Sequence, residues 1–287
     1  MNAAVKSQPV VMPACPLCGS SQAQPIAVFP ELTWVRCDCG VIYKRSEIPD
    51  VAAAHFYEGG YFGDGGTGSR YARRTGRRIG KSRRQILDML NYVEPGPLLD
   101  IGCSMGYTLA AARELGLTPA GVDVSRFAVK ACREAGFRAE TGALDALPFG
   151  DGEFALVTMK HVLEHTPDPR AALREVRRVL RPGGAVFIAV PHGGYHKARR
   201  HPQTYGYFPP NAAGREHFVY YTPATLSKLV GQEGFRVARL HPALLHRRDN
   251  LLRQACQVVI APLRLAGRTA LNALSLRKEF WLVAIRD

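Results

Sequence analysis

Four cysteines near the N-terminus have the spacing of a metal site. Cys15 and Cys18 form a Cys-x-x-Cys pair, and Cys37 and Cys39 follow after eighteen intervening residues. A glycine after each pair lets the backbone turn tightly enough for the thiolates to surround a tetrahedral Zn²⁺. Because four thiolates leave no open coordination position, the sequence predicts a structural zinc ribbon. The alternatives are four unligated buried cysteines or disulfides, and a reducing compartment disfavours disulfides.

The zinc is expected to supply most of the folding energy of this head, residues 1–48. So short a segment has little hydrophobic core, and structural zinc contributes on the order of 10 kcal/mol in comparable peptides. We therefore expect chelation to unfold only the head.

A glycine-rich turn indicates a nucleoside site later in the chain. The residues from Asp100 to Gly106 read Asp-Ile-Gly-Cys-Ser-Met-Gly, between an apolar run and a helical pattern. Small residues let the backbone approach a ligand closely, and the following helix directs free amides toward it. Such a turn can also be only a tight connection. Asp123 favours the nucleoside site, because it ends the next apolar run about 20 residues on, where a carboxylate can bind both ribose hydroxyls.

Short apolar runs alternate with helical patterns from Pro97 onward, which predicts a parallel sheet with helices on both faces. Ligands of such sheets bind at the carboxyl ends of the strands. The predicted strands are 98–101, 120–124, 138–141, 154–159, 185–190, 235–241 and 280–285. The predicted helices are 107–115, 127–135, 169–180 and one that begins at Pro223. Asp168 is expected to cap the third helix, and Gly183 to end it.

Charge is the unusual bulk property of this chain. It has 38 basic and 24 acidic residues, which gives a formal net charge of +14. The excess suits nucleic acid, an anionic membrane surface or an anionic substrate, but we favour a surface that simply carries many arginines. Part of the charge falls on a predicted amphipathic helix whose apolar stripe is Ile79, Ile86, Leu87 and Leu90. We favour a solvated basic face over an RNA track for that helix.

Composition excludes a disordered chain and a membrane-spanning helix. The hydrophobic share is 46%, and no run approaches the roughly 18 consecutive apolar residues that a spanning helix needs. The first thirteen residues have one lysine and an apolar patch interrupted by Pro9, unlike a secretory signal. We therefore expect a cytoplasmic protein.

Five segments together resemble the class I S-adenosylmethionine-dependent methyltransferases. They are Leu98–Gly106, Gly121–Ser125, Leu147–Phe149, His161–His165 with Asp168–Pro169, and Val179–Gly184. The resemblance implies an α/β fold with a doubly wound, mostly parallel seven-stranded sheet whose last strand is antiparallel. It also implies S-adenosylmethionine as cofactor. Two positions depart from the family pattern, because Ser104 replaces the usual middle glycine and Ala143 replaces an acidic residue.

The same resemblance assigns the parts of the cofactor site. The loop 102–106 would hold the methionine moiety, Asp123 the ribose and residues 142–145 the adenine, while residues 159–161 would close the pocket. The predicted cofactor-site residues are Tyr61, Asp100, Gly102, Cys103, Ser104, Gly106, Asp123, Val124, Ala143, Leu144, Asp145, Met159, Lys160 and His161.

The run His161-x-x-Glu164-His165 also matches the inverted zinc-protease motif. We reject that interpretation because Thr166 and Pro167 end the segment before a helix could present both histidines. Related quinone-pathway methyltransferases carry a metal-binding acidic and histidine cluster here. His161 replaces one of those acids, which makes a second metal the less favoured interpretation.

Methyl transfer to a hydroxyl requires a general base, and histidine, with an ordinary pKa near 6.5, is the usual one. The predicted catalytic residues are His217, Glu216 and His165. The run Glu216-His217-x-x-Tyr220 resembles zinc-ribbon-bearing sugar methyltransferases. Gly214 stands where those enzymes carry a tyrosine base, so oxygen methylation is favoured over carbon methylation of a deoxysugar.

The remaining segments complete the predicted organisation. Residues 49–94 form a linker and helical cap, 95–241 the cofactor-binding core, 242–279 an amphipathic helical insert and 280–287 the final strand. We favour a lid or a homodimer contact for the insert over a peripheral membrane helix.

The predicted function is methyl transfer from S-adenosylmethionine to a small-molecule acceptor. The favoured methylated atom is an oxygen of a sugar-bearing or secondary-metabolite intermediate. A zinc-ribbon RNA methyltransferase is the alternative enzyme, because a basic chain with such a head suits RNA. A non-catalytic nucleoside-binding scaffold is the alternative from another class of protein.

Overall fold

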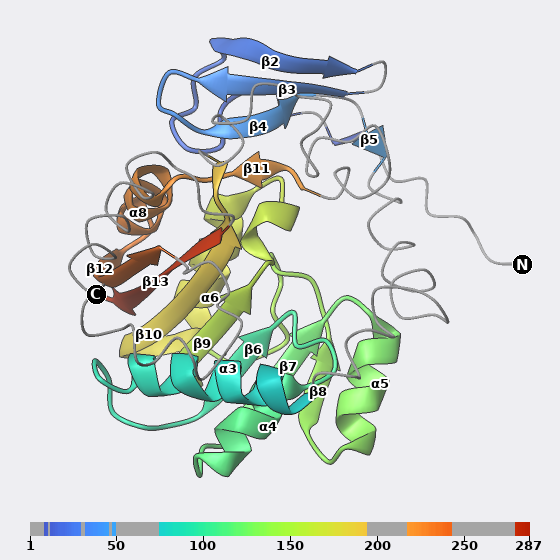
Figure 1. Ribbon diagram of the computed structural model, residues 1–287, viewed down its shortest axis with the longest axis vertical. Helices are drawn as coiled ribbons and strands as arrows, with labels where there is room; N and C mark the ends of the chain where they lie inside the picture. The colour runs from blue at the N-terminus through green and yellow to red at the C-terminus, as the bar shows by residue number, and fades with distance from the viewer. Residues whose placement is uncertain are drawn as a thin grey trace, which may run out of the picture.

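A seven-stranded sheet forms the centre of the computed structural model, which describes residues 9–10, 12–29, 32–45, 48–49, 75–193, 217–242 and 279–287. The strand order is β12-β13-β10-β9-β6-β7-β8 (Figure 1). The strands are β6 (Leu98–Ile101), β7 (Pro119–Asp123), β8 (Arg138–Thr141), β9 (Phe154–Lys160), β10 (Leu180–Pro191), β12 (Phe235–Pro242) and β13 (Glu279–Arg286). Only β13 runs antiparallel to its neighbours, β10 and β12. This arrangement confirms the predicted fold class.

Helices cover both faces of the sheet because its strands are buried on both sides. The helices are α3 (Thr75–Met89), α4 (Tyr107–Glu114), α5 (Arg126–Glu134), α6 (Pro169–Val179) and α8 (Pro223–Gln232), with a 3₁₀ turn η2 (Leu163–His165). Side chains of α3 and α4 share one hydrophobic cluster with the sheet, and side chains of α6 and α8 share another. The carboxyl ends of β6, β7 and β9 therefore meet at one edge, where the predicted site residues lie.

The end of α6 differs from the prediction. Asp168 caps the helix by accepting hydrogen bonds from the amides of Arg170 and Ala171. The helix then ends at Val179, because Leu180 already has extended backbone angles and pairs with Phe154 of β9. Gly183 has a positive φ of 72° within the irregular first part of β10, between Leu180 and Ala185, so it does not end the helix.

The buried stripe of α3 also differs from the prediction. It consists of Ser82, Gln85, Ile86 and Met89, whereas Leu87 is 44% exposed. Successive helical residues are about 100° apart, so Ile86 and Leu87 cannot both face the sheet. The stripe also contains two polar residues, which an apolar pattern does not reveal.

Two substitutions on α3 test this burial. We expect Ile86→Ala to lower the free energy of unfolding by about 2–4 kcal/mol, because it leaves a cavity in the core. Leu87→Ala, the matched control, should change it by less than about 0.5 kcal/mol, because the side chain is exposed. Urea unfolding of both variants measures the difference, and equal losses would contradict the assigned helix face.

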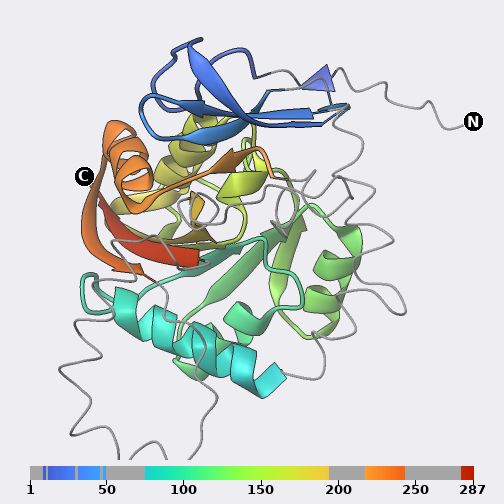
Figure 2. The same ribbon diagram turned by 45° about the horizontal axis from the view of Figure 1, so that its top comes forward.

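The N-terminal head is a small antiparallel sheet that a core strand extends. Its own strands are β2 (Ala23–Phe29), β3 (Leu32–Cys37) and β4 (Ile42–Arg45), and β11 (Val219–Tyr220) pairs with β4 at the edge. Two further short strands, β1 (Pro9–Val10) and β5 (Ile48–Pro49), pair with each other. Figures 1 and 2 show β11 as the strand between the head and the main sheet.

Large parts of two predicted segments lie outside the described residues. They are most of the linker, 50–74, and most of the insert, 243–278. The domain boundaries and the role of the insert therefore stay predictions. No helix in the described ranges combines the length and the apolar character needed to cross a membrane.

Candidate functional site

The loop after β6 has a backbone that few residues tolerate. Gly102, Ser104 and Gly106 have positive φ angles of 71°, 48° and 73°. A Cβ atom on Gly102 would lie 2.6 Å from Cγ2 of Val162, so only glycine fits there. The close packing places the loop directly against the segment that follows β9.

Asp123 fixes this loop from the end of β7. Its Oδ2 accepts a hydrogen bond from the Ser104 amide and its Oδ1 one from the Ser125 amide, each at 2.9 Å. Burial raises the pKa of Asp123, and these amides oppose the rise by stabilising the carboxylate. The structure thus brings Asp123 and the glycine-rich loop together, as the sequence predicted.

Ser104 supports a ligand at this loop. Its Oγ is buried and has no hydrogen-bond partner among the described residues, whereas its carbonyl oxygen accepts from the Cys132 thiol at 3.2 Å. A buried hydroxyl without a partner costs about 1–3 kcal/mol, so a bound polar group would satisfy it. Cys103 is buried beneath the loop. Only its backbone is suited to contact a ligand.

Asp100 and Lys160 belong to a buried polar network beneath the loop. Thr158 Oγ1 donates to Asp100 Oδ1 at 2.5 Å, and Lys160 Nζ donates to Ser82 Oγ at 3.1 Å and to Thr108 Oγ1. Burial raises the pKa of Asp100 and lowers that of Lys160, while their opposite charges counteract both shifts. Sequence analysis missed Ser82, Thr108 and Thr158. Their only signal is a polar residue within an apolar stripe or strand.

The other predicted cofactor residues vary in their surroundings. Met159 is fully buried, and Val124 is 48% exposed at the end of β7. Ala143 and Asp145 are exposed and Leu144 is half-buried in the loop after β8. Tyr61 and Glu216 lie outside the described residues.

A buried carboxylate organises the segment after β9. Glu164 is fully buried, and its Oε1 lies 3.2 Å from His161 Nδ1. The other ring nitrogen of His161, Nε2, lies 2.9 Å from Glu279 Oε2. Burial disfavours the charged ring, but these two carboxylates outweigh it and raise the pKa of His161 to about 10. His161, which has a positive φ of 55°, is therefore held as a cation between two acids.

His217 lies on the other side of Glu164 and has the opposite electrostatic character. Its Nδ1 is 3.0 Å from the Tyr220 hydroxyl, and its ring centroid is 4.6 Å from that of His165. Burial and the neighbouring His165 lower the pKa of His217 to about 3. The imidazole is therefore neutral at physiological pH.

The structure brings two of the three predicted catalytic residues together. The ligating atoms of Glu164, His165 and His217 all lie within 4.8 Å of one another. The Phe218 amide fixes this arrangement by donating to the Glu164 carbonyl at 2.7 Å. A carboxylate with two imidazoles can relay a proton or hold a metal ion. Sequence analysis missed Glu164 as the centre of this group, although it lies within the motif.

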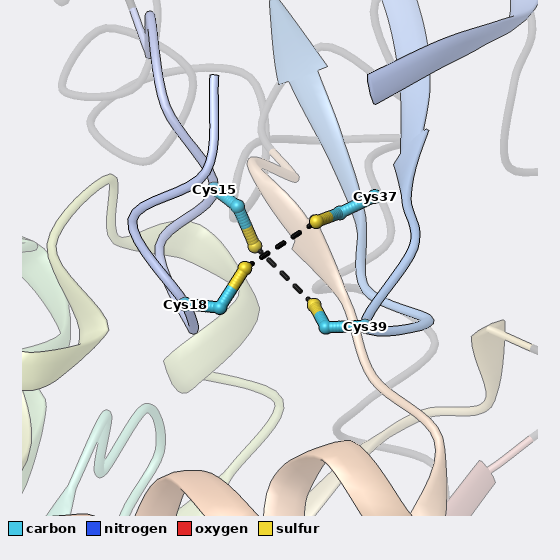
Figure 3. Close-up of side chains that lie close together, drawn as sticks. All are labelled: Cys15, Cys18, Cys37 and Cys39. Atoms are coloured by element: carbon cyan, nitrogen blue, oxygen red, sulfur yellow. Dashed lines mark hydrogen bonds between the residues drawn. The ribbon is translucent and has the colours of Figure 1, made fainter. Parts of the chain in front are cut away.

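The four head cysteines converge as a tetrahedral site requires (Figure 3). The Cys15 and Cys39 sulfurs are 3.5 Å apart and those of Cys18 and Cys37 are 3.4 Å apart. Zn–S bonds of about 2.3 Å place sulfurs about 3.8 Å apart, whereas a disulfide requires about 2.05 Å. All four ligating atoms lie within 4.8 Å of one another, so the residues fit a zinc ion.

Burial affects the protonation of the thiols in the absence of a metal ion. Burial raises the pKa of Cys15 well above its ordinary value and that of Cys39 to about 11. Burial acts in the same direction on Cys18, but the Ser20 amide and neighbouring thiols lower its pKa to about 7. Zn²⁺ would favour the thiolate form of all four groups.

A family model described as a methyltransferase domain matches residues 71–240, more than half of the chain. The chain belongs to the methyltransferase domain family. Its sheet order is that of the class I S-adenosylmethionine-dependent methyltransferases, as predicted from sequence.

Individual relatives match this chain only in part. A ubiquinone biosynthesis O-methyltransferase of Thiobacillus denitrificans is 34% identical over 99 residues, which cover 32% of this chain and 43% of the relative. The chain thus spans less than half of that relative's length.

Solved structures support the fold. A S-adenosylmethionine-dependent methyltransferase of Thermotoga maritima, described as a possible histamine N-methyltransferase, aligns with a TM-score of 0.53 and 16% identity over 83% of this chain and 99% of its own. A S-adenosylmethionine-dependent methyltransferase of Mesorhizobium loti aligns with a TM-score of 0.51 and 18% identity over 71% and 96%.

Proposed function

We propose that this protein transfers a methyl group from S-adenosylmethionine to an oxygen of a small-molecule acceptor, namely a sugar-bearing or secondary-metabolite intermediate. The observation that carries the proposal is the position of the Glu164–His165–His217 group. Val162, two residues before Glu164, packs against Gly102 of the cofactor loop. The neutral imidazole of His217 therefore lies beside the segment that packs against the loop that would hold the cofactor.

The cofactor-side residues bind and orient. Asp123 is suited to bind the ribose hydroxyls, and Ser104 and the loop amides are suited to bind the methionine moiety. Bound S-adenosylmethionine supplies an electrophilic methyl group on its sulfonium. The sulfonium is already reactive, so the protein chiefly has to place the acceptor in line with the methyl group and exclude water.

His217 is the residue suited to remove the acceptor proton. In the tautomer whose Nδ1–H donates to the Tyr220 hydroxyl oxygen, the lone pair is on Nε2, and we assign the base role to that atom. The buried Glu164 carboxylate would offset part of the cost of forming the imidazolium when His217 takes the proton, because it opposes the lowering of the His217 pKa. His161 is excluded from this role because its raised pKa keeps it protonated.

The named function of the Thiobacillus relative favours oxygen as the methylated atom. The head and the four cysteines favour a structural zinc ion as a second bound group. A cytoplasmic location and a small-molecule partner complete the proposal.

His217→Ala tests the base assignment. We expect turnover to fall by about 100-fold or more, the usual contribution of a general base, while affinity for S-adenosylhomocysteine stays within about twofold. His241→Ala is the matched control, because His241 stacks on Trp281 at 4.8 Å on the sheet edge. Mass spectrometry for a 14-dalton gain across a panel of hydroxylated acceptors measures turnover, and calorimetry measures affinity.

Other outcomes would select a different function. Unchanged turnover in His217→Ala would remove His217 from the mechanism. Absence of cofactor binding in the parent would favour the scaffold. Methylation of RNA, with binding that weakens steeply as salt increases, would favour the RNA methyltransferase.

A further inference from the structure

A strand from the methyltransferase core belongs to the sheet of the head, and buried side chains of the head and of the core form one hydrophobic cluster. Val219 and Tyr220 of β11 pair with Tyr43 and Ile42 of β4, so a strand of the core completes the sheet of the head. Buried head residues such as Val35 and Tyr43 belong to the same hydrophobic cluster as the α6 and α8 side chains. The head is therefore packed as part of the core and not as a separate unit.

A short series of contacts connects the second cysteine pair to His217. Cys37 accepts a hydrogen bond from Gly40 and donates one to Val41, which closes the turn that leads into β4. Ile42 is the first residue of β4, and its partner Tyr220 contacts His217 through the phenol hydroxyl. One turn and one strand pair thus connect a sulfur ligand to the proposed base.

Side chains reinforce the connection. The Lys44 amide donates to the Phe218 carbonyl at 2.9 Å, and Lys44 Nζ lies 4.1 Å from the centroid of the Phe218 ring. The rings of Trp34 and Tyr220 are 5.0 Å apart. Phe218, which follows His217 in sequence, and Tyr220, which contacts the His217 ring, are therefore both packed against the head.

The first cysteine pair also contacts the core. Arg170, at the start of α6, donates to the Leu17 carbonyl between Cys15 and Cys18 at 2.6 Å. The same guanidinium bonds Glu233 and Gln232 at the end of α8. The two halves of the cysteine site are thus attached to different parts of the core, and a bound metal would join them.

We propose that metal binding by the four cysteines positions residues 217–221, here called the β11 segment, so that the head positions the acceptor site. The role of the β11 segment in an acceptor site rests on the proposed function. The coupling between the metal site and the β11 segment does not. It replaces the expectation that chelation unfolds only the head, because β11 would lose its partner strand when the Cys37–Gly40 turn loosens. Core contacts at Phe218 and Tyr221 would keep the β11 segment attached but less ordered.

Zinc removal from the full chain tests the proposal by amide hydrogen exchange. We expect peptides that cover Ile42–Arg45 and the β11 segment to exchange at least about tenfold faster without zinc. Peptides that cover the loop 102–106 should not change. The Trp34 emission, isolated by Trp281→Phe in a chain with two tryptophans, should shift to the red. Affinity for S-adenosylhomocysteine should stay within about twofold.

Two results would overturn the proposal. If only residues 12–40 exchange faster while the β11 segment keeps its protection, the head is an independent module. If the loop 102–106 and cofactor affinity are lost together with the β11 segment, the metal supports the whole fold. Absence of cofactor binding in the zinc-loaded parent would instead refute the proposed function, and it would not alter the exchange result.

A substitution tests the connection between the head and the β11 segment with zinc still bound. Lys44→Met retains the buried stem of this side chain, which is 2% exposed, and removes the cation above Phe218. We expect unchanged zinc content with faster exchange in the β11 segment. Lys228→Met, on the exposed side of α8, is the matched control and should change neither property. Parent-like exchange in Lys44→Met would remove this side chain from the connection between the head and the β11 segment, and the zinc-removal experiment would then decide the proposal alone.

Discussion

Replacing Asp123 by alanine should weaken binding of S-adenosylmethionine by about 1.5–3 kcal/mol, equivalent to a roughly 10- to 150-fold higher Kd. The substitution removes the carboxylate proposed to bind the ribose. It also frees the Ser104 and Ser125 amides that the carboxylate holds at 2.9 Å, so the loop loses part of its order. Calorimetric titration with S-adenosylhomocysteine measures the loss.

Asp123→Asn separates the two contributions. The amide oxygen can still accept one backbone hydrogen bond but lacks the charge, so an intermediate affinity is expected. Asp151→Ala is the matched control, because Asp151 lies before β9 at the opposite edge of the sheet and contacts Arg178. Parent-like affinity in Asp123→Ala would refute the ribose assignment.

Local signals predicted most of the elements. The N-cap at Ser125, the N-cap at Asp168 and the capped helix at Pro223 form as their sequences indicate. The central strands β6 and β9 follow apolar runs because they are buried on both faces of the sheet, whereas the edge strand β8 is partly exposed. The errors fall at Leu87 and Gly183, where a pattern gives the type of element but not its exposed face or last residue.

Long-range pairing limited what could be predicted of the site. Glu164 and His217 are separated by more than fifty positions in sequence, and their proximity depends on the hydrogen bond between Phe218 and the Glu164 carbonyl. The pairing of β11 with the head depends on two residues, too few for a strand pattern to reveal. Asp123 was predictable because a parallel sheet places the ends of adjacent strands side by side.

The distribution of charge around Glu164 explains why neighbouring histidines differ. His161 has two carboxylates within hydrogen-bonding distance and is 46% exposed, so its cation is stabilised. His217 is buried beside His165, so its neutral form is stabilised. The second carboxylate at His161 and the burial of His217 thus shift the two pKa values in opposite directions, whereas sequence motifs alone treat the two histidines as equivalent.

Glu164→Ala should lower the free energy of unfolding by about 3 kcal/mol, because it removes a fully buried charge on which neighbouring imidazoles depend. The effect should depend on pH with a defined sign. The raised pKa of His161 stabilises the fold fully below about pH 6.5, and that contribution is lost as pH rises toward about 10. The lowered pKa of Glu164 contributes above about pH 4.5 and is lost as pH falls. The difference between parent and variant should therefore be largest between these two pH values.

Denaturant unfolding at a series of pH values, together with NMR titration of the histidine rings, measures this effect. The pKa of His161 should fall toward its ordinary value in Glu164→Ala, because only Glu279 would remain as its partner. Glu140→Ala is the matched control. Its carboxylate is 41% exposed and pairs with Arg133 at the surface, so it should cost less than about 1 kcal/mol. Equal losses in the two variants, or a loss in Glu164→Ala that grows between pH 7 and pH 10, would show that His161 does not derive its charge from this buried carboxylate.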